Sequence, residues 1–342
     1  MFRTYERSIR RYIESGKMSI GVAVVLLVAG LLVLWKGADL LVAGAVGLAE
    51  QLGVSSLVVG LTVVAMGTSA PEVAASIAGV LREVGGGDLA LGNVFGSNIA
   101  NLALVGGLVA LIRPLEVKRK TVFREIPVML IVALLLWPFL RNSYLARLEG
   151  LILLTVFTLL ILITIHTAKR EAKQTLSEAK KTNLGMKPKN PNTLKNILCV
   201  LIGLAGLALG AKITVDGAVV IGARLGLSEA VIALTIIAFG TSLPELMTCV
   251  VAAIKGHHDI SVGNLVGSNI FNTLLVTGAA GVVRPFHIES QRLAAGTNYW
   301  IMIGVSAAFA GAVIIGKRVV GRTCGIVFLA TYFVYMGYLL FV

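Results

Sequence analysis

Two short stretches, GTSAPE at residues 67–72 and GTSLPE at residues 240–245, decide how this chain folds. Each ends in a glutamate, and each lies in apolar sequence. The run around the first copy, Leu57–Leu81, is long enough to cross a bilayer. A carboxylate within such a segment is unfavourable unless a partner or a cation compensates its charge. Because the pattern occurs twice, one explanation has to serve both copies.

The composition predicts an all-α membrane protein. Hydrophobic residues make up 57% of the chain and charged residues only 14%, whereas soluble domains carry about a quarter charged residues. Apolar runs of about 18 residues or more recur along the whole chain, as transmembrane helices require. They lack the alternation of apolar and polar residues that transmembrane β-strands show. We therefore expect a multi-pass protein of the cell membrane.

The pattern of apolar runs predicts ten transmembrane helices. They cover residues 18–46, 54–82, 88–112, 122–140, 144–167, 196–222, 230–254, 260–282, 297–316 and 323–342. We divide the chain into a polar N-terminal tail at 1–17, a first five-helix repeat at 18–167, a basic linker at 168–195 and a second five-helix repeat at 196–342.

The distribution of basic residues predicts the orientation. Net charge is +13, but the lysines and arginines lie mostly between spans, where they set topology and meet anionic lipid, so nucleic acid is not an expected partner. The side of linker 168–195 carries more of them than the opposite side. The linker is therefore expected in the cytoplasm and both termini outside, although the N-terminal tail is itself basic.

The cysteines and histidines give no sign of a metal cofactor. Cys199, Cys249 and Cys324 are unclustered and lie in apolar sequence, which is typical of core residues. The four histidines lie in loops or at the ends of apolar runs, and no second ligand occurs at a plausible spacing. We expect no cofactor.

An internal repeat connects the two motif copies. Residues 37–72 align without a gap with residues 210–245, and half of the aligned positions are identical. A second block aligns 88–114 with 259–285 and contains GNVFGSNIAN at 92–101 and GNLVGSNIFN at 263–272. Each half has an odd number of spans, so its partner begins on the opposite side of the membrane. This predicts two inverted-topology repeats with a substrate site near the bilayer midplane.

The GTS-x-PE motif predicts a broken helix that binds a cation. Pro71 has no N–H, so the carbonyl of Gly67 loses its helical partner beside Glu72. Thr68 and Ser69 add hydroxyl groups. Carboxylate, carbonyl and hydroxyl oxygens are ligands of hard cations such as Ca²⁺ and Na⁺. The second copy supplies the same groups, with Gly240 and Pro244 at the break beside Thr241, Ser242 and Glu245.

The alternative interpretation of each motif is a proline kink with a protonated glutamate bonded to a neighbouring helix. Its occurrence in two inverted copies favours the cation site. Together the two glutamates would carry a charge of −2, which one Ca²⁺, two Na⁺ or two protons neutralise. A site that can be neutralised in several ways suits exchange, because an empty charged site is costly to bury.

The second motif adds neutral polar groups at helical spacing. Asn93, Ser97 and Asn101 are four residues apart and so lie on one helix face. We favour ion coordination for Ser97, Asn101, Ser268 and Asn272, with polar packing between helices as the alternative. Asn93 and Asn264 are the candidates for holding the broken helices by hydrogen bonds.

These two motif pairs resemble the α-repeats of the calcium/cation antiporter superfamily, specifically its sodium/calcium exchangers in a compact prokaryotic form. The resemblance implies a secondary active transporter, not an enzyme, that extrudes Ca²⁺ by alternating access as Na⁺ flows in. It implies Ca²⁺ ligands from Glu72, Glu245 and the carbonyls of Thr68 and Thr241. It implies Na⁺ ligands from both glutamates and from Ala65, Ser69, Ser97, Ala238, Ser242 and Ser268, the alanines through their carbonyls, with Asn101 and Asn272 lining the central site.

The chain departs from some relatives at Asn272, where they carry an aspartate associated with K⁺ use. Asn272 therefore suggests exchange that does not depend on K⁺. The closest rival is a Ca²⁺/H⁺ antiporter, but that branch typically has Asn-Ala where this chain has Thr68-Ser69, and the hydroxyls favour Na⁺. An intramembrane phosphate hydrolase would need Arg or His near the acids, and the motifs contain none. A passive Ca²⁺ channel is a further alternative. The expected partners are inorganic cations and membrane lipid, and the expected state is a monomer.

Overall fold

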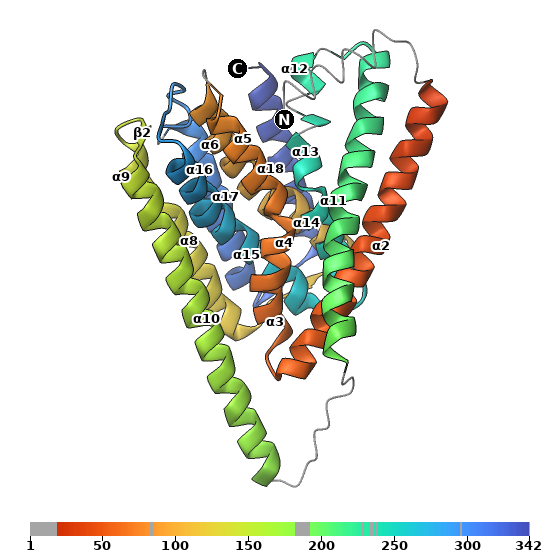
Figure 1. Cartoon of the computed structure of the whole chain (residues 1–342), viewed down its shortest axis with the longest axis vertical. Helices are drawn as coiled ribbons and strands as arrows, with labels where there is room; N and C mark the ends of the chain where they lie inside the picture. The colour runs from red at the N-terminus through yellow and green to blue at the C-terminus, as the bar shows by residue number, and fades with distance from the viewer. Residues whose placement is uncertain are drawn as a thin grey trace.

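The computed structural model describes residues 19–82, 85–181, 192–227, 229–232, 235–236, 238–294 and 296–341. The described chain is almost entirely helical, and its helices fan out from α2 and α11 at one edge to α10 at the other (Figure 1). The α-helices are α2 (Ile20–Leu52), α3 (Ser56–Val59), α4 (Ala65–Thr68), α5 (Ala70–Val80), α6 (Gly86–Ile99), α7 (Gly106–Ile112), α8 (Ile126–Leu135), α9 (Trp137–Leu140), α10 (Arg147–Lys181), α11 (Thr193–Arg224), α12 (Glu229–Ile232), α13 (Ala238–Thr241), α14 (Leu243–Ile254), α15 (His258–Phe271), α16 (Thr277–Val283), α17 (Thr297–Ile315) and α18 (Arg322–Phe341).

Short π-helical segments and strands complete the architecture. The π-helical segments are η1 (Gly60–Val64), η2 (Ala100–Val105), η3 (Thr121–Glu125) and η5 (Asn272–Val276). The strands are β1 (Leu115–Glu116), β2 (Tyr144–Leu145), β3 (Phe286–His287) and β4 (Val319–Val320). β1 pairs with β4 and β2 pairs with β3, both antiparallel, so each pair joins a turn of the first half of the sequence to one of the second.

By length and composition, eight helices in the described part of the chain could cross a membrane. They are Ile20–Leu52, Gly86–Ile112, Thr121–Leu140, Arg147–Gln174, Thr193–Arg224, His258–Val283, Thr297–Ile315 and Arg322–Leu339. A ninth candidate, Ser56–Thr68 with Ala70–Val80, is bent by 42°. The seventh predicted span, 230–254, is the remaining one: it contains positions outside the described residues, and its apolar helix α14 has only 12 residues. The all-helical membrane fold is thus confirmed, whereas the count of ten stays a prediction.

The segment expected to be a linker is helical over half its length. Helix α10 continues to Lys181 and α11 begins at Thr193, while residues 182–191 lie outside the described residues, as does the tail at 1–17. Helix α10 has 35 residues, which corresponds to about 52 Å, well beyond the roughly 30 Å of a bilayer core. Its polar end is rich in Ala, Lys and Glu, which are strong helix formers, so the helix extends past the apolar run.

Helices α2 and α11 pack against each other through glycines along their length. A Cβ on Gly37 would lie 2.8 Å from the backbone nitrogen of Leu207, and one on Gly210 would lie 2.7 Å from that of Leu34. Small residues at such positions let two backbones approach closely in a membrane protein. Several other glycines on the two helices have equally close neighbours. The pair therefore forms a tightly packed unit at one edge of the bundle (Figure 1).

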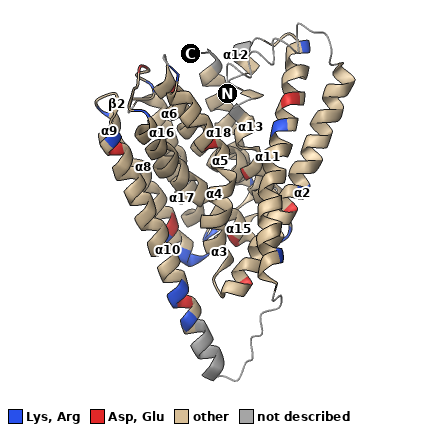
Figure 2. Ribbon diagram, viewed as in Figure 1, with Lys and Arg blue, Asp and Glu red and all other residues tan. Residues whose placement is uncertain are grey.

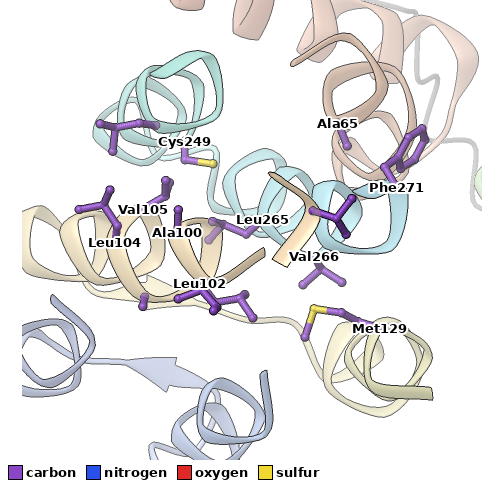
Figure 3. Packing of buried hydrophobic residues seen from close by; sticks show 14 of the residues in the cluster. Ala65, Ala100, Leu102, Leu104, Val105, Met129, Cys249, Leu265, Val266 and Phe271 are labelled. Carbon is purple, nitrogen blue, oxygen red and sulfur yellow. The ribbon is translucent and has the colours of Figure 1, made fainter. Parts of the chain in front are cut away.

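Apolar side chains fill the space between the remaining helices. Figure 3 shows Leu265 of α15 facing Ala100 of η2, with Met129 of α8 nearby. These three side chains are at most 4% exposed. Charged residues are scarce in the middle of the bundle, where most of the ribbon is tan in Figure 2. Any buried carboxylate there consequently has few charged neighbours.

Candidate functional site

Both GTS-x-PE motifs break their helices as predicted. Ser69 separates α4 from α5 with φ −84° and ψ 5°, and Ser242 separates α13 from α14 with φ −88° and ψ 0°. A proline follows in the first turn of each second helix. Glu72 and Glu245 therefore lie in the first turns of α5 and α14, where the positive end of the helix dipole favours a carboxylate.

The two glutamates share one buried site. Each is only 1% exposed, and two ionised carboxylates buried at one site repel each other. Ser69 of the first motif donates a hydrogen bond from Oγ to Oε1 of Glu245, at 3.1 Å. Among the described residues, Oε2 of each glutamate has no hydrogen-bond partner. The motifs thus meet in space although they lie in different halves of the sequence.

The segments that carry the neutral polar residues of the second motif pack against the helices of this pair. Helix α5, with Glu72, contacts η5, which begins at Asn272. Helix α14, with Glu245, contacts η2, which contains Asn101. Helix α4 contacts α15, which carries Ser268, and α13 contacts α6, which carries Ser97. Each glutamate helix is therefore packed against the asparagine-bearing segment of the other half of the sequence.

Several buried polar atoms in this region are unsatisfied. Within the described part of the chain, neither side-chain atom of Asn101 or Asn272 has a hydrogen-bond partner, and the same is true of Oγ in Ser242 and Ser268. These four residues are at most 1% exposed. Buried polar groups in native proteins are nearly always paired, and leaving one unpaired costs about 1–3 kcal/mol. Such a concentration of unpaired groups indicates a site that is completed by a ligand.

The donor set fits a hard cation as the substrate. The unpaired oxygens belong to two carboxylates, two amides and two hydroxyls, which are the ligand types that Ca²⁺ prefers. No group of three or more His, Cys, Asp or Glu residues suited to a metal occurs among the residues described. The site therefore offers few charges and many neutral oxygens, unlike a thiolate or imidazole site for a transition metal.

Asn93 and Asn264 hold the broken helices, as the sequence suggested. Asn93 donates from Nδ2 to the backbone carbonyl of Glu72 at 3.1 Å and to Oγ of Ser76 at 2.9 Å. Asn264 accepts from Oγ1 of Thr68 at 3.1 Å and donates to Sγ of Cys249 at 3.3 Å. Each asparagine thereby fixes a segment next to a motif glutamate instead of facing the unpaired cluster.

Two backbone expectations are modified by the structure. The carbonyl of Ala65, expected to be free, accepts a hydrogen bond from the Ser69 N–H at 3.0 Å and a longer one from Thr68 Oγ1 at 3.4 Å. Gly67 does more than loosen the helix, because a Cβ there would lie 2.3 Å from a methyl group of Leu204 on α11. A larger residue at the break would require the Leu204 side chain to move.

The second motif packs in the same way. A Cβ on Gly240 would lie 2.2 Å from a methyl group of Val215, also on α11. Thr241 is half-buried at the end of α13, and Ala238 begins that helix. The structure thus brings the hydroxyl of Ser69 to Glu245, and the roles of the motif residues as ion ligands remain predictions.

The π-helical segments were not foreseen from the sequence. η1 precedes the first helix break, and η2 and η5 place Asn101 and Asn272 at corresponding points of the two halves. A π turn inserts one extra residue and so turns the side chains that follow, which explains its frequency at functional sites. The side-chain pattern carries no signal for it, and the only available hint was that both segments follow the repeated GSN tripeptide.

Comparisons with known proteins agree on one family. The family model described as sodium/calcium exchanger protein matches residues 22–166 and 195–341. The putative antiporter CaxA of Alkalimonas amylolytica is 37% identical over 94% of this chain and 99% of its own length. The sodium/calcium exchanger MaX1 of Methanosarcina acetivorans is 32% identical over 84% of this chain and 90% of its own length. A structure of the sodium–calcium exchanger NCX_Mj superposes with a TM-score of 0.78 and 29% identity, over 94% of this chain and all of that one.

Proposed function

The chain belongs to the sodium/calcium exchanger protein family, and from this premise we propose that it exchanges Na⁺ for Ca²⁺ at the buried site between Glu72 and Glu245. The observation that carries the proposal is the pairing of these two carboxyl groups, each 1% exposed, among unpaired amide and hydroxyl oxygens. A cation is the ligand that satisfies all of these groups at once. The relatives that match this chain are named as exchangers and antiporters, which supports a transporter.

Charge neutrality supports exchange over passive flow. The two glutamates are the acids of the site, and one Ca²⁺ balances them as well as two Na⁺ do. Two buried carboxylates without a balancing cation are strongly unfavourable. The transporter with bound ions therefore changes between its inward-open and outward-open states more readily than the empty transporter. Alternating access with Ca²⁺ in one direction and Na⁺ in the other follows from this difference. A channel would need no such balance.

We assign the ligands as the family resemblance implies. Ca²⁺ binds Glu72, Glu245 and the carbonyls of Thr68 and Thr241. Na⁺ binds both glutamates together with the motif serines Ser69, Ser97, Ser242 and Ser268 and the carbonyls of Ala65 and Ala238. The hydroxyl of Ser69, already bonded to Glu245, would turn its oxygen toward Na⁺ when the ion binds. Asn272 in place of a third acid makes the exchange independent of K⁺.

We further propose that two inverted five-helix repeats, 18–167 and 196–342, build this site. The aligned sequence blocks support this. So does the helix packing: α5 of the first half contacts η5 of the second half, and α14 of the second half contacts η2 of the first half. The linker at 168–195 is assigned to the cytoplasm and both termini to the outside, from the excess of basic residues on the linker side. The transporter would act as a monomer in the cell membrane, surrounded by lipid.

The alternative is exchange of Ca²⁺ for protons at the same site. The repulsion between Glu72 and Glu245 favours this reading, because protonation removes it as effectively as a cation does. The hydroxyls of the motifs favour Na⁺, since a proton on a carboxylate needs no hydroxyl ligands.

Ion fluxes separate the two functions. Purified protein in proteoliposomes is given external ⁴⁵Ca²⁺ and either an outward Na⁺ gradient or an outward proton gradient of equal size. We expect uptake with the Na⁺ gradient and none beyond background with the pH gradient alone. Uptake that follows the pH gradient and ignores Na⁺ would refute Na⁺ coupling and establish the alternative.

A further inference from the structure

Two arginines contact the far ends of the two glutamate helices. Arg284 donates from Nη1 to the carbonyls of Leu81 and Arg82, at 3.4 and 3.2 Å, just beyond the end of α5. Arg113 donates from Nη1 to the carbonyls of Ala253 and Ile254, at 3.2 and 3.0 Å, at the end of α14. Each arginine therefore belongs to one half of the sequence and caps the glutamate helix of the other half.

The caps lie at the two ends of the bundle. Ser56 is the first residue of the bent span, and Gly256 lies just beyond the end of α14 that Arg113 contacts. Both residues line one surface cleft, so the Arg113 cap lies at the end of the bundle where the bent span begins. Leu81 follows the opposite end of that bent span. The last carbonyls of a helix lack intrahelical partners and carry the negative end of its dipole. A guanidinium group donates hydrogen bonds to these carbonyls, and its positive charge offsets the dipole. This explains why an arginine lies at the end of each glutamate helix.

The arginines are themselves held in place. Arg113 directly follows the span that carries Asn101, and Arg284 directly follows the span that carries Asn272. Both have extended backbones, with φ −145° and ψ 122° for Arg113 and φ −148° and ψ 117° for Arg284. A proline follows each, and then a strand, β1 after Arg113 and β3 after Arg284. Because β1 pairs with β4 and β3 with β2, neither arginine sits on a free loop.

We propose that Arg113 and Arg284 are positioning residues for the cation site, a role that rests on the proposed function of that site. Each connects the far end of an asparagine-bearing span to the far end of the glutamate helix packed against it. The helix and the span are thereby fixed at both ends, at the ion site and at the arginine. The carboxylate of the glutamate is held at a set distance from the asparagine of the same pair.

The length of the glutamate helices makes this second point of attachment important. Leu81 lies nine positions after Glu72, a distance of about 14 Å along a helix. A tilt of about 5° over that length displaces the carboxylate by about 1 Å, whereas binding sites work within roughly 0.5 Å of their productive geometry. Helix α5 is made largely of small residues, so apolar packing alone resists tilting weakly. Loss of the cap should therefore weaken cation binding before it affects the fold.

The test compares Ca²⁺ affinity in variants that lose a cap with a matched surface variant. Arg113→Gln and Arg284→Gln keep a polar side chain but shorten it, and they remove the charge together with the Nη1 donor that makes the contacts. Arg141→Gln is the control, because the Arg141 guanidinium lies over the Trp137 ring, 4.6 Å from its centroid. Equilibrium ⁴⁵Ca²⁺ binding to the purified protein gives the Kd, Na⁺-driven uptake gives the maximal rate, and thermal unfolding without Ca²⁺ gives the Tm.

We expect the Kd for Ca²⁺ to rise about 3- to 10-fold in each cap variant, as for the loss of one or two hydrogen bonds. The maximal rate should change less than the Kd, and Arg141→Gln should bind Ca²⁺ as the wild type does. Arg113→Lys and Arg284→Lys should restore part of the affinity, because lysine keeps the charge but not the planar donor group. The double cap variant should show roughly the product of the two effects, since the caps are far apart.

Three results would overturn the proposal. An unchanged Kd in both cap variants would do so, and so would an equal rise in Arg141→Gln. A lowered Tm with unchanged affinity would show that the caps serve stability alone. Wild-type protein that binds Ca²⁺ but takes up none with a Na⁺ gradient would refute the proposed exchange, and the comparison of Kd values would still decide the role of the arginines.

Discussion

The hydroxyl of Ser69 donates a hydrogen bond to Oε1 of Glu245 at 3.1 Å, although 176 residues separate the two in the chain. One residue follows the break in the first motif and the other follows the break in the second. The bond therefore joins the two motifs directly at the buried site. It also makes the site asymmetric, because Oγ of Ser242, the counterpart of Ser69, has no partner among the described residues.

Neutralising either glutamate should abolish exchange without loss of the fold. Glu72→Gln and Glu245→Gln keep the shape of the side chain and remove one of the two charges that bind the cation. The unliganded variants should have a Tm equal to or above that of the wild type, because the repulsion between two buried carboxylates disappears. Na⁺-driven ⁴⁵Ca²⁺ uptake and thermal unfolding measure the two effects. Normal uptake by either variant would remove that glutamate from the site.

The asymmetry of the two serines predicts different effects on stability. Ser69→Ala removes a buried hydrogen bond to a carboxylate, so it should lower the stability of the unliganded protein by about 1–3 kcal/mol. Ser242→Ala removes a hydroxyl that is unpaired within the described structure, so stability should stay equal or rise. Both changes should weaken Na⁺ activation of exchange more than Ca²⁺ affinity. Equal destabilisation by the two changes, measured by thermal unfolding, would contradict the observed bonding.

The sequence predicted the meeting of the two motifs from the internal repeat and from the odd number of spans that we assign to each half. Glu72, Glu245, Pro71 and Pro244 could be placed at helix breaks from residue chemistry alone, since proline removes a specific hydrogen bond. The bond between Ser69 and Glu245 could not, because it depends on the relative rotation of helices far apart in the chain. Repeat symmetry would also have suggested an equivalent bond from Ser242.

Other features were not predicted from the sequence, for identifiable physical reasons. The π-helical segments depend on how neighbouring helices pack, and propensities do not encode them. The extension of α10 to Lys181 was missed because the prediction ended the span where the apolar run ends, while helix propensity continues beyond it. Arg113 and Arg284 lay inside the aligned blocks, each followed by a proline. That repeated Arg-Pro pair was a usable signal.

Introducing a third acid should change the ion dependence of transport. Asn272 is fully buried in η5, and both of its side-chain polar atoms are unpaired within the residues described. We expect wild-type exchange to be the same in K⁺-free and K⁺-containing media. Asn272→Asp places a further titratable group in the site, so its apparent Ca²⁺ affinity should fall more steeply as the pH is lowered. Wild-type exchange that requires K⁺ would contradict the role given to Asn272.

The close packing of α2 on α11 predicts a large difference between two glycine substitutions. A Cβ on Gly37 would lie 2.8 Å from the nitrogen of Leu207 and 3.0 Å from the carbonyl oxygen of Gly203, and neither backbone atom can move freely. Gly37→Ala should therefore destabilise the protein by about 1–3 kcal/mol. Gly304→Ala on α17 is the matched control, because a Cβ there meets no atom within 4 Å. Thermal unfolding that ranks the two variants in the opposite order would contradict the packing.

The central claim is that Ca²⁺ and Na⁺ compete for one site built by Glu72 and Glu245. Its most direct test is equilibrium binding of ⁴⁵Ca²⁺ to the purified protein at rising Na⁺, with K⁺ or choline keeping the ionic strength constant. The account predicts that Na⁺ displaces Ca²⁺ completely, that K⁺ and choline do not, and that Glu72→Gln and Glu245→Gln each abolish the Na⁺-sensitive binding. Ca²⁺ binding that is indifferent to Na⁺, or that survives in either glutamine variant, would contradict it.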